Sequence, residues 1–383
     1  MMKKILVYNS FSNMMPELIV WMIYLQNFGW SIAEIALLQG IFTFFSAIFE
    51  IPSGIIADKI GYKRALQLAE LICIFYLISY FFPLNRMVIY IGFICFSLGL
   101  SLISGTDTSL LYNITDGNKF LKYMGIFNSL GIISVAFGNL IGGWIAEKSW
   151  TLLFLISLLF RVVALICITS FDVSKIREVE PIADNKKAIK LYLERLYDFV
   201  KTTKKFKYIL VSSAFLMSSV TLSYQYMPVV LEQLSLTTGQ VSLIYAIVSV
   251  LGSVLSFFSE KLTSKWSSRG VAVIIFFISL LLFLGIGRFP YHSIIVTISF
   301  MVPNILYELL SVIIDSTVHE DLRDDIRASS ISLINFANSI MLTFGSILVS
   351  LLSGLFSLQI TISLICTTLM LLSLLSYIEF GRR

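Results

Sequence analysis

Residues 54–64 read Gly54-Ile-Ile-Ala-Asp58-Lys59-Ile-Gly61-Tyr-Lys63-Arg64 and lie between two long apolar stretches. Gly54 lacks a side chain, so it would allow a neighbouring helix to approach closely. Asp58 falls where a helix should end and can accept hydrogen bonds from backbone N–H groups or basic side chains. Gly61 permits the positive φ that a tight reversal needs. The basic residues of this loop, Lys59, Lys63 and Arg64, are typical of the cytoplasmic side of a membrane.

The composition indicates a polytopic membrane protein. Of the 383 residues, 57% are hydrophobic and 13% are charged, whereas a soluble domain carries about 25% charged residues. A helix needs about 20 apolar residues to cross a bilayer. Twelve stretches meet this requirement, near 5–28, 33–56, 65–83, 87–111, 121–146, 150–171, 208–231, 238–260, 270–288, 292–317, 327–354 and 357–379. We therefore expect an all-α integral membrane protein with twelve transmembrane helices.

The basic residues fix an expected orientation. The first stretch follows Lys3 and Lys4 and lacks a small-residue cleavage site, so it should remain as the first helix. With both termini on one side, that side collects all of the 28 Lys and Arg residues except Arg86, Lys148, Arg288 and Arg161. Positive charge accumulates in cytoplasmic loops. We therefore expect both termini to be cytoplasmic and the protein to lie in the cell (inner or plasma) membrane.

The chain also contains an internal repeat. Residues 23–66 align without gaps on 229–272, and each copy has a helix-starting capping box, Ser31 with Glu34 and Thr237 with Gln240. The loop at 54–64 has a partial second copy, in which Ser264 stands where Asp58 does. Two six-helix halves in the same orientation form a parallel repeat. The sequence predicts an N-terminal half at 1–172 and a C-terminal half at 208–383.

A polar segment at 173–207 joins the two halves. From Lys186 to Lys207, apolar residues recur at helical spacing and Lys or Arg fills the other faces. This pattern predicts an amphipathic helix on the inner membrane surface. A calmodulin-type target site is the alternative interpretation.

The loop at 54–64 resembles the cytoplasmic signature loop of the major facilitator superfamily. Glu50-Ile-Pro52-Ser-Gly54 before it resembles members related to bacterial drug and metabolite exporters. Gly138-Asn139-Leu-Ile-Gly142-Gly143 resembles the glycine-rich antiporter motif of that family, although Asn139 stands where the motif has proline. The resemblance implies two pseudo-symmetric six-helix bundles whose first, fourth, seventh and tenth helices line a central cavity. It also implies that the loop at 54–64 is a conformational switch.

Several charged residues fall inside predicted spans, where charge is costly and usually functional. They are Glu17, Asp107, Arg161, Glu308 and Asp315, while Glu70 is expected near the interface, in contact with the signature loop. Asp107 and Asp315 are candidates for gating hydrogen bonds or for substrate ligands. Glu308 either faces a central cavity or makes a contact within its own half.

Arg161 and Glu17 each have two interpretations. Arg161 either pairs with a carboxylate, for which Glu17 and Asp107 are the candidates, or binds an anionic group of the substrate. Glu17 follows Pro16, which can kink the first helix. Glu17 is either a carboxylate that titrates during transport or half of a structural ion pair.

The predicted cavity has a polar and aromatic character. The seventh helix carries the polar set Ser219, Ser223, Tyr224, Gln225 and Tyr226. Aromatic and Met side chains suit an amphipathic or partly apolar organic molecule. We expect Gln225 to contact such a substrate.

The sequence therefore predicts a secondary active transporter, with proton-coupled efflux of a small organic compound as the leading hypothesis. An importer on the same scaffold and a non-transporting membrane sensor are the alternatives. The cysteines lie in apolar runs without metal-ligand spacing, and no nucleotide-binding loop is present. We accordingly expect no enzyme activity, no cofactor or metal and no nucleic-acid partner. We expect the protein to work in the lipid bilayer as a monomer.

Overall fold

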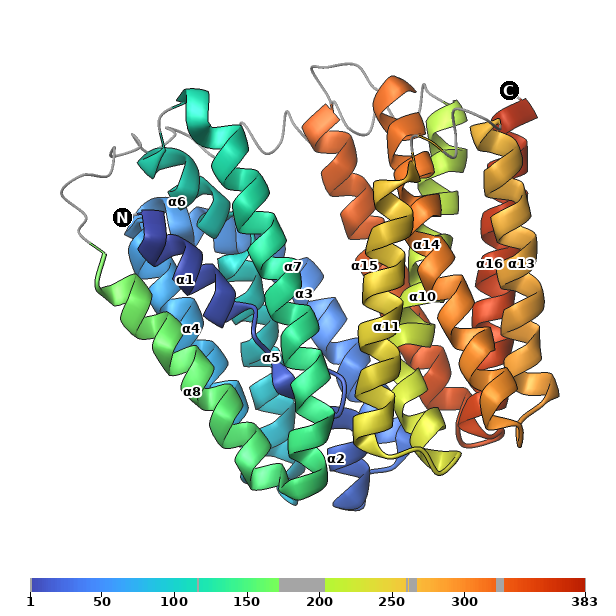
Figure 1. The fold of residues 1–383 in the computed structure, drawn as a ribbon, viewed down its shortest axis with the longest axis horizontal. Helices are drawn as coiled ribbons and strands as arrows, with labels where there is room; N and C mark the ends of the chain where they lie inside the picture. Colours follow the sequence, from blue (N-terminus) through green and yellow to red (C-terminus); the bar gives the residue numbers. More distant parts are fainter. Residues whose placement is uncertain are drawn as a thin grey trace. The chain divides into compact units, whose positions relative to one another are not determined.

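The structure, a computed structural model, describes residues 2–115, 117–171, 204–259, 261, 267–321 and 327–382. Within these residues every regular element is a helix (Figure 1). The predicted all-α fold class is therefore confirmed. The amphipathic helix predicted at 186–207 lies almost entirely outside the described residues, and only its last residues appear, at the start of α10.

The chain divides into two compact units. Unit 1 comprises Met1–Ser31, Ile41–Pro181 and Thr237–Ala246, and unit 2 comprises Ile32–Gly40, Ile182–Leu236 and Ile247–Arg383. The helices from the first half of the chain are α1 (Met2–Ser12), η1 (Pro16–Leu18), α2 (Trp21–Asn27), α3 (Ile32–Ile60), α4 (Tyr62–Ser79), α5 (Arg86–Ile103), α6 (Thr106–Ile114), α7 (Gly117–Lys148) and α8 (Trp150–Thr169). Those from the second half are α10 (Lys204–Gln233), α11 (Thr238–Phe257), α13 (Ser268–Arg288), α14 (Ser293–Asp321), α15 (Arg327–Leu352) and α16 (Leu358–Arg382).

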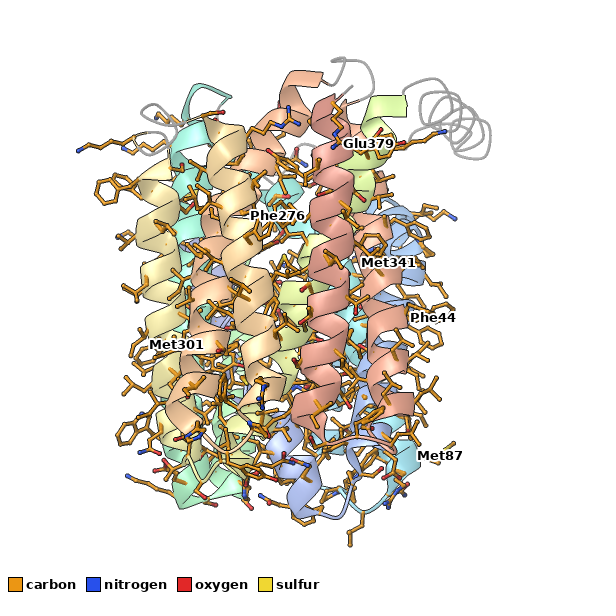
Figure 2. All side chains as sticks on the ribbon, turned by 90° about the vertical axis from the view of Figure 1, so that its right-hand side faces the viewer. Phe44, Met87, Phe276, Met301, Met341 and Glu379 are labelled. Carbon is orange, nitrogen blue, oxygen red and sulfur yellow. The ribbon has the colours of Figure 1, made fainter. Side chains whose placement is uncertain are left out.

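Ten segments of the described chain are long and apolar enough to cross a membrane. Two of the twelve predicted spans do not meet these criteria. The first is divided among α1, η1 and α2, each of which is too short. The other is the span predicted at 65–83, which corresponds to α4 and carries three charged residues, Lys63, Arg64 and Glu70, within its 18 residues. Side chains such as Phe44 and Met87, which are 44% and 68% exposed, project away from their helices (Figure 2), as expected for a surface that faces lipid.

Two of the predicted continuous helices are broken. The first helix stops at Ser12 and resumes as the short helix η1 at Pro16, with Met15 in a non-helical conformation (φ −121°, ψ 80°). Proline cannot donate a helical hydrogen bond, which accounts for a break there. The fourth helix is interrupted at Gly105, whose φ of 76° lies in the left-handed region that glycine enters without strain. Irregular backbone at membrane depth is tolerated where it is buried in protein, as Pro16 and Glu17 are at the first break.

Helix starts agree with the predicted repeat. Gly61 and Ser267 occupy equivalent positions in the two copies, and each immediately precedes a helix, α4 and α13 respectively. The second capping box is confirmed: the backbone N–H of Thr237 donates to Gln240 Oε1 (2.9 Å) and that of Gln240 donates to Thr237 Oγ1 (3.3 Å).

Within unit 1 the start of α11 is held against the end of α7. The hydroxyl of Thr238 donates to the carbonyl oxygen of Gly143 (2.9 Å), and the N–H of Gly143 donates to Ser242 Oγ (3.0 Å). The carboxylate of Glu147 accepts from the N–H of Gly239 (2.8 Å). An acid at a helix start is favourable because the unpaired N–H groups and the helix dipole point toward it.

Candidate functional site

The signature loop forms the reversal between α3 and α4. Gly61 has φ 85°, as the sequence predicted. The Nζ of Lys63 donates to the carbonyl oxygen of Phe171 (2.5 Å), beyond the C-terminal end of α8. Asp58 is exposed, as are Lys59 and Arg64. The close approach predicted at Gly54 is not found, because a Cβ built there would have no described atom within 4 Å.

The break in the first helix packs directly on the glycine motif of α7. A Cβ placed on Gly138 would lie 3.0 Å from the backbone N of Met15, and one on Gly142 would overlap the carbonyl oxygen of Pro16. Glycine is therefore required on α7 for the irregular backbone to come this close. The motif residue Asn139 is buried, and no partner is found for its Oδ1 among the described residues.

A group of one hydroxyl and three charged side chains lies inside unit 1 and is called here the polar cluster: Ser12, Glu17, Glu70 and Arg161. They come from α1, η1, α4 and α8, and none is more than 4% exposed. The Nη1 of Arg161 lies 3.2 Å from Glu70 Oε2 and also donates to Ser12 Oγ (3.2 Å). The hydroxyl of Ser12 in turn donates to Glu70 Oε1 (2.6 Å). Three side chains thus form a closed ring, and both carboxylate oxygens of Glu70 are engaged.

Glu17 completes the cluster without joining the ring. It faces Ser157 and is close enough to Arg161 for an electrostatic interaction. In the described part of the chain, Glu17 Oε2 and Arg161 Nη2 are buried and have no hydrogen-bond partner. Buried polar side-chain atoms are paired in most proteins, so these two atoms are exceptions.

The cluster corrects two predictions about Arg161 and Glu70. The ion-pair partner of Arg161 is Glu70, not Glu17 or Asp107, and Glu70 is fully buried with Arg161 and Ser12 as its partners, not the signature loop. The sequence contained a signal for this burial. Glu70 shares a helical stripe with Leu66, Cys73 and Leu77, all buried, at the three- and four-residue spacing of one helix face.

The other candidate residues lie apart from the cluster. Asp107 is half-buried in the first turn of α6, where its Oδ1 accepts from the N–H of Thr108 (2.6 Å). Gln225 is half-buried on α10, with no described partner for Oε1. Asp315 belongs to α14, but its side chain lies outside the described residues. Among the residues searched, no group of three His, Cys, Asp or Glu side chains is placed to hold a metal ion.

Glu308 borders a cavity inside unit 2. The cavity has a volume of about 210 Å³ and lies between α10, α11 and α14. Its polar lining consists of Thr221, Tyr224, Ser249, Asn304, Tyr307 and Glu308. The sequence left two alternatives for Glu308: a central cavity, or a contact within its own half. The cavity that Glu308 borders is lined entirely by residues of unit 2.

Apolar helices, buried charges and helices broken beside those charges define a multi-pass membrane protein of the transporter class. A model of the Major Facilitator Superfamily matches residues 5–346, so the chain belongs to this family. Membership confirms the predicted resemblance and places the chain among transporters, not enzymes.

Two relatives and one solved structure illustrate the similarity. The chain is 27% identical over 128 residues to the uncharacterized MFS-type transporter YxaM of Bacillus subtilis, covering 33% of this chain and 32% of that protein. It is 24% identical over 266 residues to the uncharacterized MFS-type transporter MJ1560 of Methanocaldococcus jannaschii, covering 67% of this chain and 66% of that protein. These matches therefore span about a third and just under two thirds of the relatives' lengths. The crystal structure of the nucleoside transporter NupG aligns with a TM-score of 0.82 at 13% identity, covering 100% of this chain and 98% of that one, and so shares the fold.

Proposed function

We propose that this protein is a secondary active transporter that exports a small organic compound in exchange for protons, by alternating access across the cell membrane. The observation that carries the proposal is the composition of the polar cluster. It contains two carboxylates, Glu17 and Glu70, and one guanidinium, Arg161, each at most 2% exposed. Both termini are proposed to be cytoplasmic, from the distribution of basic residues.

The charge count of the cluster supports a bound proton. If both carboxylates were ionised, one negative charge would lie in the bundle interior without a counter-ion. A buried ion without a partner costs several kcal/mol. One proton on either acid removes that cost, so the cluster holds one proton in its most favourable form.

Glu17 is the acid proposed to carry this proton. Glu70 already uses both oxygens, on Arg161 and Ser12. Glu17 Oε2 is unpartnered in the described chain, and the Ser157 hydroxyl that Glu17 faces donates to the carbonyl oxygen of Leu153 (3.0 Å). Since the hydroxyl hydrogen is used there, the Ser157 oxygen can accept a hydrogen bond from a protonated Glu17.

The position of Glu17 supports coupling between the proton and a movement. Glu17 follows the break in the first helix, and the glycine motif of α7 packs against that break. A change of charge at Glu17 therefore acts where the backbone is least constrained by helical hydrogen bonds. Discontinuous helices mark ion and substrate sites in many transporters. The antiporter-like sequence of the glycine motif is the reason for proposing exchange and export.

The test is transport by purified protein in proteoliposomes whose interior is acidic. A panel of lipophilic cations, peptides and small acids is screened, and a transported compound should accumulate inside as protons leave. Glu17→Gln should abolish accumulation driven by the pH gradient but retain downhill counterflow, because the amide keeps the shape and cannot titrate. Glu379→Gln, at the end of α16, is the control and should accumulate normally.

Each contrary result has a distinct meaning. Accumulation only from an acidic exterior would identify an importer. Binding without transport of any compound would identify a sensor. Unchanged proton dependence in Glu17→Gln would remove Glu17 from the coupling mechanism.

A further inference from the structure

The cavity in unit 2 has a lining suited to one chemical class of ligand. Two tyrosine side chains, Tyr224 and Tyr307, and one carboxylate, Glu308, border it, and none of the described Lys or Arg residues does. Glu308 has no cationic partner among the described residues. An anionic ligand would meet this carboxylate without compensation, whereas a cation would neutralise it.

The tyrosines add a second attraction for a cation. The face of an aromatic ring carries negative charge, so it attracts ammonium groups within about 6 Å of its centre. Both tyrosine side chains are half-buried, and the hydroxyl of Tyr224 is hydrogen-bonded to Ser249, which holds its ring in place.

Asn304 and Gly252 shape the rest of the site. Asn304 is buried, and its Nδ2 donates to the carbonyl oxygen of Phe300 (2.8 Å), so its Oδ1 remains as an acceptor at the cavity wall. A Cβ on Gly252 would lie 2.8 Å from Glu308 Cγ, so glycine at this position of α11 makes room for the Glu308 side chain.

We propose that this cavity binds the ammonium head group of an organic cation, which is the substrate class of the transporter; this inference rests on the proposed function. The volume sets the size of the bound part. Pockets that enclose drug-sized ligands measure about 300–1,000 Å³, so about 210 Å³ accommodates a head group and not a whole drug. A bare metal ion is a poorer fit, because hard cations require several oxygen ligands, usually including more than one carboxylate.

The test is equilibrium binding to the full-length protein purified in detergent. Choline and benzyltrimethylammonium share a trimethylammonium head group and serve as probes. Their neutral control is 3,3-dimethylbutan-1-ol, which has the shape of choline with carbon in place of the charged nitrogen. Both cations should bind in a saturable manner, and the alcohol should bind at least about tenfold more weakly.

Variants of the cavity locate the binding. Glu308→Gln should weaken binding of both cations at least about tenfold, since it removes the counter-charge. Tyr307→Leu should weaken binding between about two- and thirty-fold, while Tyr307→Phe, which keeps the ring face, should bind like the natural protein. Glu232→Gln replaces an acid on α10 outside the cavity and should have no effect.

The comparison of choline with its neutral analogue uses the natural protein, so it stands even if a variant fails to fold. Equal binding of the two compounds, or no binding of either cation, would overturn the inference. Full affinity in Glu308→Gln would overturn it as well. Cation binding at this site without transport of any compound would leave the inferred binding site standing, and would contradict both the proposed function and the assignment of the cation as its substrate. Transport of neutral or anionic compounds by a protein that binds neither cation would contradict the inferred cation site and leave the proposed function standing.

Discussion

Replacing Arg161 with alanine should destabilise unit 1 and leave unit 2 unchanged. The substitution removes the ion pair to Glu70 and the hydrogen bond to Ser12, both 3.2 Å long. Glu70 is then left fully buried with Ser12 as its remaining partner. Removing one member of a buried ion pair costs about 3–5 kcal/mol. For a unit of 150–250 residues, 1 kcal/mol lowers the melting temperature by about 2–4 °C, so a decrease of about 6–20 °C is expected.

The cysteines provide an assay that separates the two units. Cys73 in unit 1 and Cys366 in unit 2 are both fully buried. A maleimide dye that fluoresces on reacting with thiols reports each one as it becomes exposed on heating. One reporter protein retains Cys73 alone and the other retains Cys366 alone, with the remaining cysteines, including Cys95 and Cys167, changed to serine. Arg161→Ala should lower the Cys73 transition and leave the Cys366 transition in place.

Two further variants make the reasoning refutable. Arg161→Met combined with Glu70→Met replaces the pair with apolar side chains and should recover most of the lost stability, because no buried charge is left alone. Arg382→Ala removes an exposed pair, 3.9 Å from Glu379, and should shift either transition by no more than about 4 °C. The reasoning would be refuted if the Cys73 transition of Arg161→Ala occurred at the same temperature as in the natural protein. It would also be refuted if the double variant melted no higher than Arg161→Ala.

Three other substitutions test the remaining features. Gly142→Ala should sharply reduce the yield of folded protein in size-exclusion chromatography, because the added Cβ overlaps the carbonyl oxygen of Pro16. Gly131→Ala is the control: its Cβ meets only ordinary contacts at 3.5 Å or more, so the yield should stay normal. Lys63→Met removes a charged hydrogen bond worth about 1.5–3 kcal/mol, so the Cys73 transition should fall by several degrees, and an unchanged transition would argue against the bond. Asp58→Asn should fold normally but slow transport at matched expression, as expected if its charge biases a two-state equilibrium, and full transport would contradict this role.

The features that the sequence predicted well are those set by local chemistry. The positive φ of Gly61 and the capping box of Thr237 and Gln240 depend on residues within one turn, so their spacing is sufficient. The partner of Arg161 was predicted incorrectly because pairing depends on how α4 and α8 are rotated toward each other. Depth along the membrane, the only coordinate used, favoured Glu17 and Asp107. The break between Ser12 and Pro16 was predicted only as a kink, since the extent of unwinding depends on how closely α7 approaches, and glycines on a distant helix decide that.

The hydrogen bond from Lys63 to the end of α8 has a counterpart in the other half of the chain. Arg269 occupies the equivalent position of the repeat and donates to the carbonyl oxygens of Gly381 (2.6 Å) and Ile378 (3.4 Å) at the end of α16. Both copies of the repeat therefore carry a base at this position, whereas Ser264 stands in the second copy where Asp58 stands in the first. The shared base ties the start of one helix to the end of another within each half, so it serves the folding of a single half, whereas the acid is present in the first half alone.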